Sequence, residues 1–284
     1  MKAYHEQYIR AAEILQLILL QHIYAQSGSQ NLVFQGGTAL RWCYGGGRFS
    51  EDLDFVFSCP LKTVDAILGK ALKGAEREMV PHFGPGRLQS DDKKSRSGAR
   101  KLMATWQPDA GRRRIAVKLE FEPLAPDINL DTNPFVLSSL PAVAYLITAG
   151  EFRIPRPNSV LVAETSAEIL SDKVRALLER SYLKGRDLYD VWYLTAMLGT
   201  TVDRHLVERK LCAYSWPFVP ARKLAYFIEP DKNGRGDIAM AIRQDLERFL
   251  PAEVMEVHRA DGYAAFFRAV RDLCAELRLA GVEA

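Results

Sequence analysis

The fold is decided by two neighbouring stretches, Phe34-Gln35-Gly36-Gly37-Thr38-Ala39-Leu40-Arg41 and Arg48-Phe49-Ser50-Glu51-Asp52-Leu53-Asp54-Phe55. A short apolar run, Leu32-Val33-Phe34, leads into a glycine pair and a hydroxyl residue, and the next residues suit one or two helical turns. The second stretch then places two aspartates one residue apart. We expect a phosphate-binding turn, a short helix and a metal-binding strand, in that order.

The aspartate pair predicts a metal site. Asp52 and Asp54 are separated by one residue, so on a strand both carboxylates point to the same face, while Leu53, Phe55 and Phe57 face a core. Two adjacent carboxylates repel each other unless a cation lies between them, which favours Mg²⁺. Taken alone the pair also fits surface acids or a turn, and the glycine pair at this distance favours the metal site.

The glycine pair predicts a phosphate site. Gly36 and Gly37 expose backbone N–H groups and allow close approach, and Thr38 adds a hydroxyl just before a helix. Such an arrangement is typical of sites that bind phosphate.

Composition bounds the class of protein. The chain has 284 residues, 48% hydrophobic and 26% charged, with a net charge of +3, which suits a globular protein of two domains. The cysteines Cys43, Cys59, Cys212 and Cys274 are scattered, so we expect neither a disulfide framework nor a zinc site, and a cytoplasmic location fits. The polar N-terminus is unlike a signal peptide, and the most apolar run, 14–24, is too short to span a membrane.

The order of elements predicts an α+β fold. Helical spacing runs over 4–26 and 61–80, and residues 81–100 suit a loop. Residues 102–106 and 114–122 suit two strands of a hairpin. From residue 165 the pattern is helical. We therefore expect a mixed α/β domain over 1–160 and a helical domain over 161–284.

A third carboxylate is expected on the second hairpin strand. Lys118, Glu120 and Glu122 share its polar face, and two-metal phosphoryl chemistry uses several carboxylates. Glu120 is the preferred ligand and Glu122 the second choice. The alternative is an ordinary exposed strand face with a Lys–Glu pair.

Charged groups also gather around residues 166–198. A helix from 167 to about 184, ended by Gly185, would carry Lys173, Arg180 and Lys184 on one face, suited to a triphosphate. Asp190 in the next helix would orient Lys173 or Arg41. The alternative is that helix dipoles explain these charges and that Asp187 only caps the second helix.

A basic segment lies between residues 87 and 118. It favours contact with an RNA backbone, with Trp106 and Phe83 available for base stacking. The alternative is a solvated loop. The segment holds ten basic residues, Arg87, Lys93, Lys94, Arg96, Arg100, Lys101, Arg112, Arg113, Arg114 and Lys118, against three acidic ones, Asp91, Asp92 and Asp109.

These residues resemble a known family. Gly36 to Arg41 with Arg48 to Phe55 is similar to the first motif of the AbiEii-type nucleotidyltransferase toxins of the AbiE and MenAT toxin–antitoxin systems, within the DNA polymerase β-like superfamily. Lys118-Leu119-Glu120 resembles the second motif. Lys173 to Arg180 and Arg186-Asp187-Leu188-Tyr189-Asp190 resemble the last two. The match covers residues 30 to 200, and the last third has no matching motif.

The resemblance implies a polymerase-β-like core, a mixed sheet with flanking helices, and a helical C-terminal domain. It implies transfer of a nucleoside monophosphate from an NTP, with one or two Mg²⁺ ions, to an RNA acceptor, most notably the tRNA 3′ end, which would block translation. It also implies a cognate antitoxin as partner. The implied catalytic residues are Asp52, Asp54, Lys173 and Asp190, the nucleotide-binding residues are Gly36, Gly37, Thr38, Arg41, Lys118 and Arg180, and the metal ligands are Asp52, Asp54 and Glu120.

Ser50 is a candidate regulatory residue. It lies two residues before Asp52, so on a continuous strand it shares the face of the aspartates. A phosphate there would add about −2 charge beside the metal site, so we predict that phosphorylation inactivates the protein. The alternative is a hydroxyl that bonds a local backbone group.

Two other functions fit the same motifs. One is a nucleotidyltransferase that modifies a small molecule of the antibiotic kind, which acidic groups in the acceptor cleft would favour. The other is a non-catalytic module that binds a partner through a degenerate core, which the full set of acids and Lys173 argue against.

Overall fold

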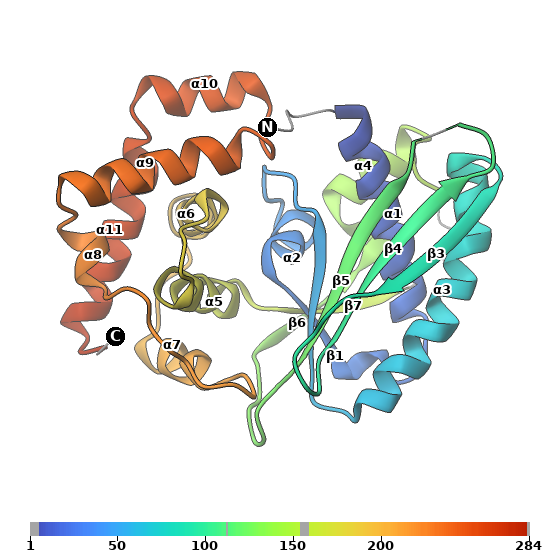
Figure 1. Cartoon of the computed structure of the whole chain (residues 1–284), viewed down its shortest axis with the longest axis horizontal. Helices are drawn as coiled ribbons and strands as arrows, with labels where there is room; N and C mark the ends of the chain where they lie inside the picture. The colour runs from blue at the N-terminus through green and yellow to red at the C-terminus, as the bar shows by residue number, and fades with distance from the viewer. Residues whose placement is uncertain (1–5, 112, 154–158, 283–284) are drawn as a thin grey trace.

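The computed structural model describes residues 6–111, 113–153 and 159–282, and is built on one seven-stranded mixed sheet (Figure 1). The strand order is β3-β4-β5-β2-β1-β7-β6. Arg112 of the basic segment lies outside the described residues. The expected α+β class is confirmed.

The centre of the sheet carries the motifs. β1 (Leu32–Gln35) pairs antiparallel with β2 (Asp52–Phe57), and β2 pairs in parallel with β5 (Ile115–Pro123). Beyond β5 lie β4 (Arg100–Pro108) and β3 (Gly86–Asp92), both antiparallel to their neighbours. On the other side, β7 (Val160–Glu164) runs parallel to β1 and antiparallel to β6 (Thr132–Val136).

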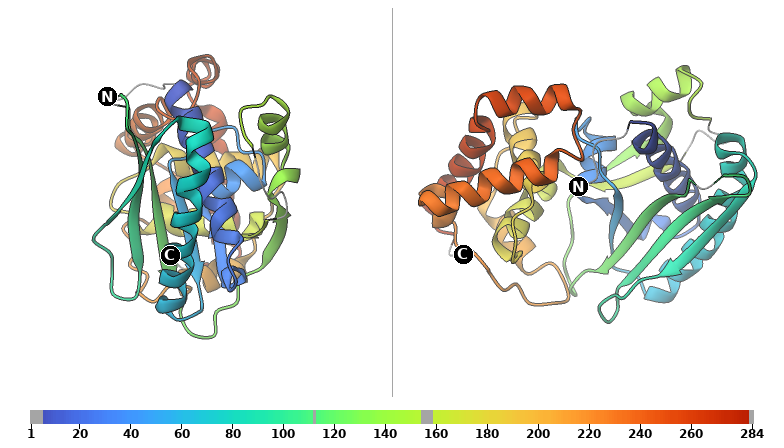
Figure 2. Two further views of the ribbon diagram at one scale, coloured as in Figure 1. Left: turned by 90° about the vertical axis from the view of Figure 1, so that its right-hand side faces the viewer. Right: turned by 45° about the horizontal axis from the view of Figure 1, so that its top comes forward.

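Two long helices cover one face of this sheet. α1 (Glu6–Tyr24) and α3 (Leu61–Phe83) pack against each other, and Figure 2 shows them side by side. Beneath them Phe55 stacks on Phe121 with ring centroids 4.7 Å apart. Leu53, Phe55 and Phe57 are all buried, as the alternation predicted. Burial of this apolar face holds β2 so that its aspartates face away from the core.

Shorter elements connect the strands. The 3₁₀ turn η1 (Ser29–Asn31) precedes β1, and α2 (Gly36–Cys43) follows it directly. After β6 come a second 3₁₀ turn, η2 (Leu137–Ser139), and α4, a helix over Pro141–Thr148.

The rest of the described chain is helical. α5 packs on α6 and α7, and α6 packs on α9 and α11 (Figure 1). Because α5 also contacts α2 and β7, it joins this bundle to the sheet. The helices are α5 (Ser166–Glu179), α6 (Gly185–Trp192) continued by the π turn η3 (Tyr193–Met197), α7 (Arg204–Leu211), α8 (Ala225–Ile228), α9 (Lys232–Leu246), α10 (Ala252–Ala260) and α11 (Ala264–Leu279). The sheet ends at Glu164, close to the domain boundary expected near residue 160, and the division into domains stays a prediction. No helix within the described ranges is long and apolar enough to cross a membrane.

Two local predictions were wrong. The segment 81–100 is not simply a loop, because α3 extends to Phe83 and β3 follows. β3 is an edge strand that is mostly exposed, with Leu88 packed on the core. Its sequence therefore lacks the alternation of apolar and polar residues that marks a half-buried strand. The predicted hairpin of β4 and β5 is confirmed.

The helix expected over 167–184 also ends earlier, at Glu179, so Lys184 does not share a helical face with Lys173. Gly185 begins α6 and does not end α5. A Cβ at Gly185 would lie 2.5 Å from the Ala241 carbonyl oxygen of α9, so this glycine permits close helix packing.

Candidate active site

The parallel pairing of β2 and β5 brings the predicted acids together. In register, Asp52 lies beside Lys118 and Asp54 beside Glu120, whereas Glu122 lies beside Val56. Side chains of neighbouring parallel residues share a face, so Glu120 is the carboxylate adjacent to Asp54. The register therefore favours Glu120 over Glu122 as the third acid of the cluster.

Two lysines partly neutralise these acids. The Lys118 ammonium lies 2.9 Å from Asp52 Oδ2 and 2.6 Å from Glu120 Oε1, and Lys101 Nζ lies 2.7 Å from Glu120 Oε2. Asp54 forms no such ion pair with any described residue. Its pKa is raised to about 7 by desolvation and by the negative charges of Asp52 and Glu120, which together outweigh the opposite effect of Lys118 and Lys173. The Asp54 end of the cluster is thus left without a direct cationic partner in the described part of the chain.

The donor set fits a magnesium ion that shares its ligands with a substrate. Among the described residues, no group of three or more Asp, Glu, His or Cys side chains is close enough to hold a metal by itself. Mg²⁺ is usually bound through one or two carboxylates, with water and substrate phosphate oxygens as its other ligands. Asp54 and its neighbours offer hard oxygen donors, and Asp54 forms no ion pair with any described residue, which matches that mode.

The glycine pair lies against this cluster. Gly36 has a φ of +77°, and a Cβ there would lie 3.0 Å from Asp54 Oδ2. At Gly37 a Cβ would lie 2.3 Å from the Arg48 guanidinium nitrogen Nη2. Both glycines line the cavity described below. Position 37 therefore needs a glycine to leave room for the buried Arg48 side chain, as well as for any phosphate. The sequence did not reveal the first of these reasons.

Two hydroxyl residues near the glycines are buried. The Thr38 hydroxyl donates to the Asp52 carbonyl oxygen, which ties α2 to β2, and Thr38 is not among the residues that line the cavity. The hydroxyl is therefore already engaged, and a phosphate contact of Thr38 stays a prediction. Ser50 precedes β2, so it is not on the strand as expected, and its carbonyl accepts a hydrogen bond from Gln16. A regulatory role of Ser50 stays a prediction, and its burial means that a kinase needs local opening.

A buried network of ion pairs connects α5 and α6 to Arg48, whose guanidinium lies against Gly37. The Arg48 guanidinium donates two hydrogen bonds of 2.6 Å to Asp190, which is fully buried. Lys173 Nζ lies 2.8 Å from Asp190 and 3.0 Å from Asp187, and Arg180 also pairs with Asp187. Despite burial, the neighbouring cations lower the pKa of both aspartates. The network therefore holds Lys173 charged at the cavity.

The network confirms the expected contact between Asp190 and Lys173. It also corrects the expected arginine partner of Asp190 and the alternative that Asp187 caps the helix. Asp190 contacts Lys173, but its arginine partner is Arg48 and not Arg41. Arg41 bonds Glu13 and the Gly46 carbonyl and is not among the cavity-lining residues. Asp187 is not the helix cap, because Lys184 occupies that position and Asp187 lies in the first turn, paired with Lys173.

Arg41→Gln is therefore expected to keep nucleotide transfer within about threefold of the parent activity. Its loss should cost about 1 kcal/mol of stability, because the buried Glu13 keeps Arg10 as a partner. Arg48→Gln is the matched contrast and should lose both stability and most activity. Steady-state rates and thermal unfolding check this pair, and equal losses in both variants would contradict it.

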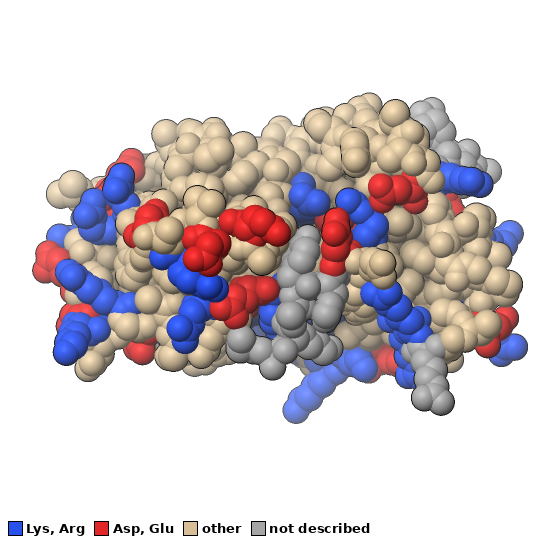
Figure 3. Space-filling model, turned by 90° about the horizontal axis from the view of Figure 1, so that it is seen from above, with Lys and Arg blue, Asp and Glu red and all other residues tan. Residues whose placement is uncertain are grey.

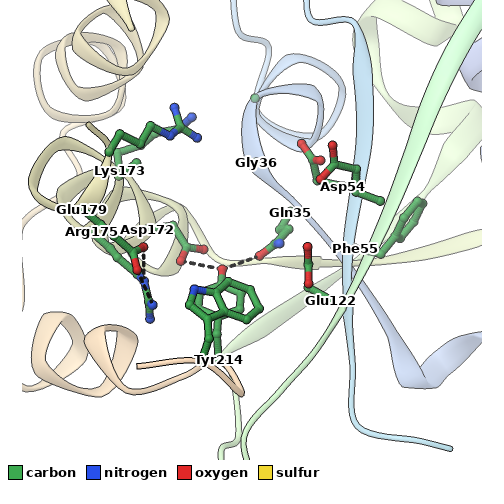
Figure 4. A pocket seen from close by; sticks show the side chains of 15 residues that line it. Gln35, Gly36, Asp54, Phe55, Glu122, Asp172, Lys173, Arg175, Glu179 and Tyr214 are labelled. Carbon is green, nitrogen blue, oxygen red and sulfur yellow. Dashed lines mark hydrogen bonds and ion pairs between the residues drawn. The ribbon is translucent and has the colours of Figure 1, made fainter. Parts of the chain in front are cut away.

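A cavity of about 240 Å³ lies between the sheet and α5. Figure 4 shows Asp54 and Glu122 on the sheet side and Lys173 on the helical side. Several functional residues were given no role from the sequence. Arg48 belongs to the quoted aspartate stretch but does not line the cavity. Four lining residues lie within the quoted stretches, namely Gln35, Arg175, Ala176 and Glu179, whereas Asp172, Tyr214 and Trp216 lie outside them.

The basic segment does not form one surface. Lys93, Lys94 and Arg96 are exposed in the loop between β3 and β4, whereas Arg113 and Arg114 are exposed in the turn between β4 and β5, at the opposite end of β4. Over the described residues of the face in Figure 3, basic side chains are interspersed with acidic ones.

The expected base stacking by Trp106 is wrong. This side chain is fully buried and packs near Phe83 in the core, with ring centroids 6.5 Å apart.

A mixed sheet with adjacent acids on parallel strands, a glycine turn against them and buried cations across a cavity defines a nucleotidyltransferase. A family model described as "Nucleotidyl transferase AbiEii toxin, Type IV TA system" matches residues 18–273. The chain belongs to this family of toxin–antitoxin nucleotidyltransferases, as the sequence motifs indicated.

Two solved structures share the fold. JHP933 from Helicobacter pylori is 17% identical, with a TM-score of 0.59 over 98% of this chain and 96% of that one. A structure described as a nucleotidyltransferase from H. pylori is 16% identical, with a TM-score of 0.59 over 98% of this chain and 100% of that one. No curated protein matches the chain.

Proposed function

We propose that the protein transfers a nucleoside monophosphate from an NTP to the 3′ end of an RNA, foremost tRNA, in a magnesium-dependent reaction that blocks translation and that a cognate antitoxin restrains. The observation that carries the proposal is the cavity in which Asp54 and Glu120 face Lys173 and Arg180. Carboxylates on one wall suit metal and attacking hydroxyl, and cations on the other suit a triphosphate. Such substrates place the reaction in the cytoplasm.

Each group has a part in the proposed reaction. The acceptor 3′-hydroxyl gives its proton to a carboxylate of the cluster, and its oxygen forms a bond to the α-phosphorus while the bond to the bridging oxygen of the β-phosphate breaks, so that pyrophosphate leaves. Asp52, Asp54 and Glu120 would hold Mg²⁺, which when bound neutralises charge on the phosphate oxygens. Gly36 and Gly37 line the cavity, and their backbone would contact the phosphates there. Lys173 and Arg180 stabilise the charge that develops on the leaving group, and Asp190 and Asp187 position them.

Lys118 takes a different part from the other cations. Its ammonium lies between Asp52 and Glu120, so it holds these acids together and supports nucleotide binding from the sheet side.

An RNA acceptor is favoured by the charges at the mouth of the cavity. Arg96 lies over Trp216, which lines the cavity, and exposed Lys93 and Lys94 belong to the same loop. The acids on the helical wall are compensated, because Glu179 pairs with Arg175 and Asp172 with Lys210. A cationic small molecule would need free acids there.

The test is incubation of the purified protein with total tRNA, Mg²⁺ and each α-labelled NTP in turn. We expect label on tRNA with at least one NTP, and its loss with EDTA. Asp52→Ala should abolish labelling while the thermal unfolding transition persists, since Asp52 is partly exposed. Retained labelling by this variant would exclude the assigned site.

Two outcomes point to the other functions. Label on an aminoglycoside but not on any RNA would indicate a small-molecule nucleotidyltransferase. Absence of Mg²⁺-dependent NTP binding by calorimetry would indicate a non-catalytic module.

A further inference from the structure

Trp216 is a partly exposed aromatic side chain at the rim of the cavity. Its ring stacks on Tyr214 with centroids 4.8 Å apart and an interplanar angle of 26°. The Arg96 guanidinium of the β3–β4 loop lies 4.2 Å from the Trp216 ring centroid. Residues distant in sequence thus converge on one indole beside the acids.

Buried polar groups hold this aromatic pair in place. Arg175 is buried, and its guanidinium donates to Glu179 at 3.0 and 3.1 Å and to the Lys210 and Leu211 carbonyls at 2.9 Å each. The same guanidinium lies 4.7 Å from the Tyr214 ring centroid. The Tyr214 hydroxyl donates to Asp172 at 2.9 Å. A stacking surface whose support is buried is preorganised for a ligand.

A second observation concerns the opposite wall. Glu122 lines the cavity, and its Oε2 is buried without a hydrogen-bond partner among the described residues. Lys101 approaches only the other oxygen, Oε1, at 3.4 Å. Figure 4 shows the Tyr214 ring and the Glu122 carboxylate within the same cavity. A buried unpaired acceptor is costly, so the cavity suits a ligand that donates a hydrogen bond there.

We infer that Trp216 is a stacking platform for a nucleobase whose exocyclic amino group donates to Glu122. Flat rings stack on tryptophan, and arginine planes also stack on bases. Arg96 is exposed, so its guanidinium can shift from the indole to the outer face of the base. The base is then held between Trp216 and Arg96. This inference rests on the proposed function and names a binding subsite within it.

The base can come from the NTP or from the acceptor RNA, and fluorescence of the full chain distinguishes them. Trp42 and Trp106 are buried, and Trp192 lies in α6 and is not among the residues that line the cavity, so quenching that is lost in Trp216→Leu reports on Trp216. The probes are CTP, inorganic triphosphate, and a short single-stranded RNA with a free 3′-hydroxyl. We expect quenching by CTP or by the RNA, but none by triphosphate, and loss of the quenching in Trp216→Leu.

Kinetics of the variants give the second readout. Trp216→Leu should raise KM at least about fivefold for the substrate that supplies the base, with kcat within about twofold. Trp216→Phe keeps an aromatic face and should recover most of the affinity. An unchanged unfolding temperature checks that the loop of Tyr214 and Trp216 remains folded.

The contact with Glu122 has its own test. Cytosine has an amino donor where uracil has a carbonyl acceptor, so CTP, or an RNA that ends in cytidine, should bind more tightly than its uridine counterpart. Glu122→Gln should reduce the difference in affinity between the cytidine and uridine ligands, because an amide side chain both accepts and donates hydrogen bonds. Equal binding of both bases by the parent protein overturns this contact.

Failure of the platform and failure of the proposed function give different results. Unchanged KM values in Trp216→Leu, with tRNA labelling intact, overturn the platform and leave the function. Quenching by CTP or RNA without nucleotide transfer supports the platform and overturns the function. Absence of quenching by every base-carrying probe overturns the platform.

Discussion

Asp54→Asn is expected to abolish nucleotide transfer without loss of stability. Asp54 is a half-buried carboxylate that lines the cavity, and Glu120 lies beside it in register on the neighbouring strand. Asparagine keeps the shape but removes the charge that a divalent cation requires. We expect a fall in kcat/KM of about 1,000-fold, which corresponds to about 4 kcal/mol of transition-state stabilisation.

Stability should stay the same or increase, and this distinguishes a functional acid from a structural one. Burial and the negative charges of Asp52 and Glu120 raise the pKa of Asp54 to about 7, so its ionised form is unfavourable in the folded protein at neutral pH. Neutral asparagine removes this repulsion. The unfolding temperature in EDTA at pH 8 should therefore be no lower than that of the parent.

The matched control is Asp91→Asn, in an exposed position on β3. It removes one charge from the same domain and should leave both activity and stability unchanged. A large loss of stability in Asp54→Asn, or equal activity in the two variants, would contradict the assignment of Asp54 to the catalytic cluster.

Gly37→Ala is expected to destabilise the protein by about 3 kcal/mol and to remove most activity. Alanine is the better helix former, so propensity alone predicts the opposite sign. The added Cβ would lie 2.3 Å from Arg48 Nη2 and 3.2 Å from its Cζ. Arg48 must move, which breaks both of its hydrogen bonds to the fully buried Asp190.

The loss of activity follows from the same network. Asp190 also pairs with Lys173. Displacement of Arg48 therefore removes one of the cations beside Asp190 and changes the charge around Lys173. Differential scanning calorimetry and tRNA labelling measure the two effects. Gly69→Ala in α3 is the control, because a Cβ at Gly69 meets no atom of the described residues within 4 Å. It should stabilise the protein by about 0.5–1 kcal/mol, and destabilisation by both variants would contradict the steric reason.

The local secondary structure around the motifs could be predicted from the sequence. Alternation around Asp52 and Asp54 predicted a strand with a core face and an acid face, and the strand at Ile115–Pro123 was read in the same way. Periodicity and burial create these patterns within a few residues, so they survive without knowledge of the fold. The family followed from the same motifs, and the family match over residues 18–273 confirms it.

Contacts between residues that are far apart in the sequence were decided only by the tertiary structure. Arg48 and Asp190 are 142 positions apart, and only the packing of α6 against the glycine turn makes them a pair. The basic segment is contiguous in sequence, yet β4 carries its two halves to opposite ends of the sheet.

The opening stretch shows the same division. Its order of turn, helix and strand came from local sequence, and so did the placing of both aspartates on one face. That Gly37 serves a buried arginine, that Thr38 bonds Asp52, and that Trp216 lies at the cavity all depend on which distant groups become neighbours. Hydrogen bonds and ion pairs act over a few ångströms in space, without regard to distance along the chain, so only the fold determines them.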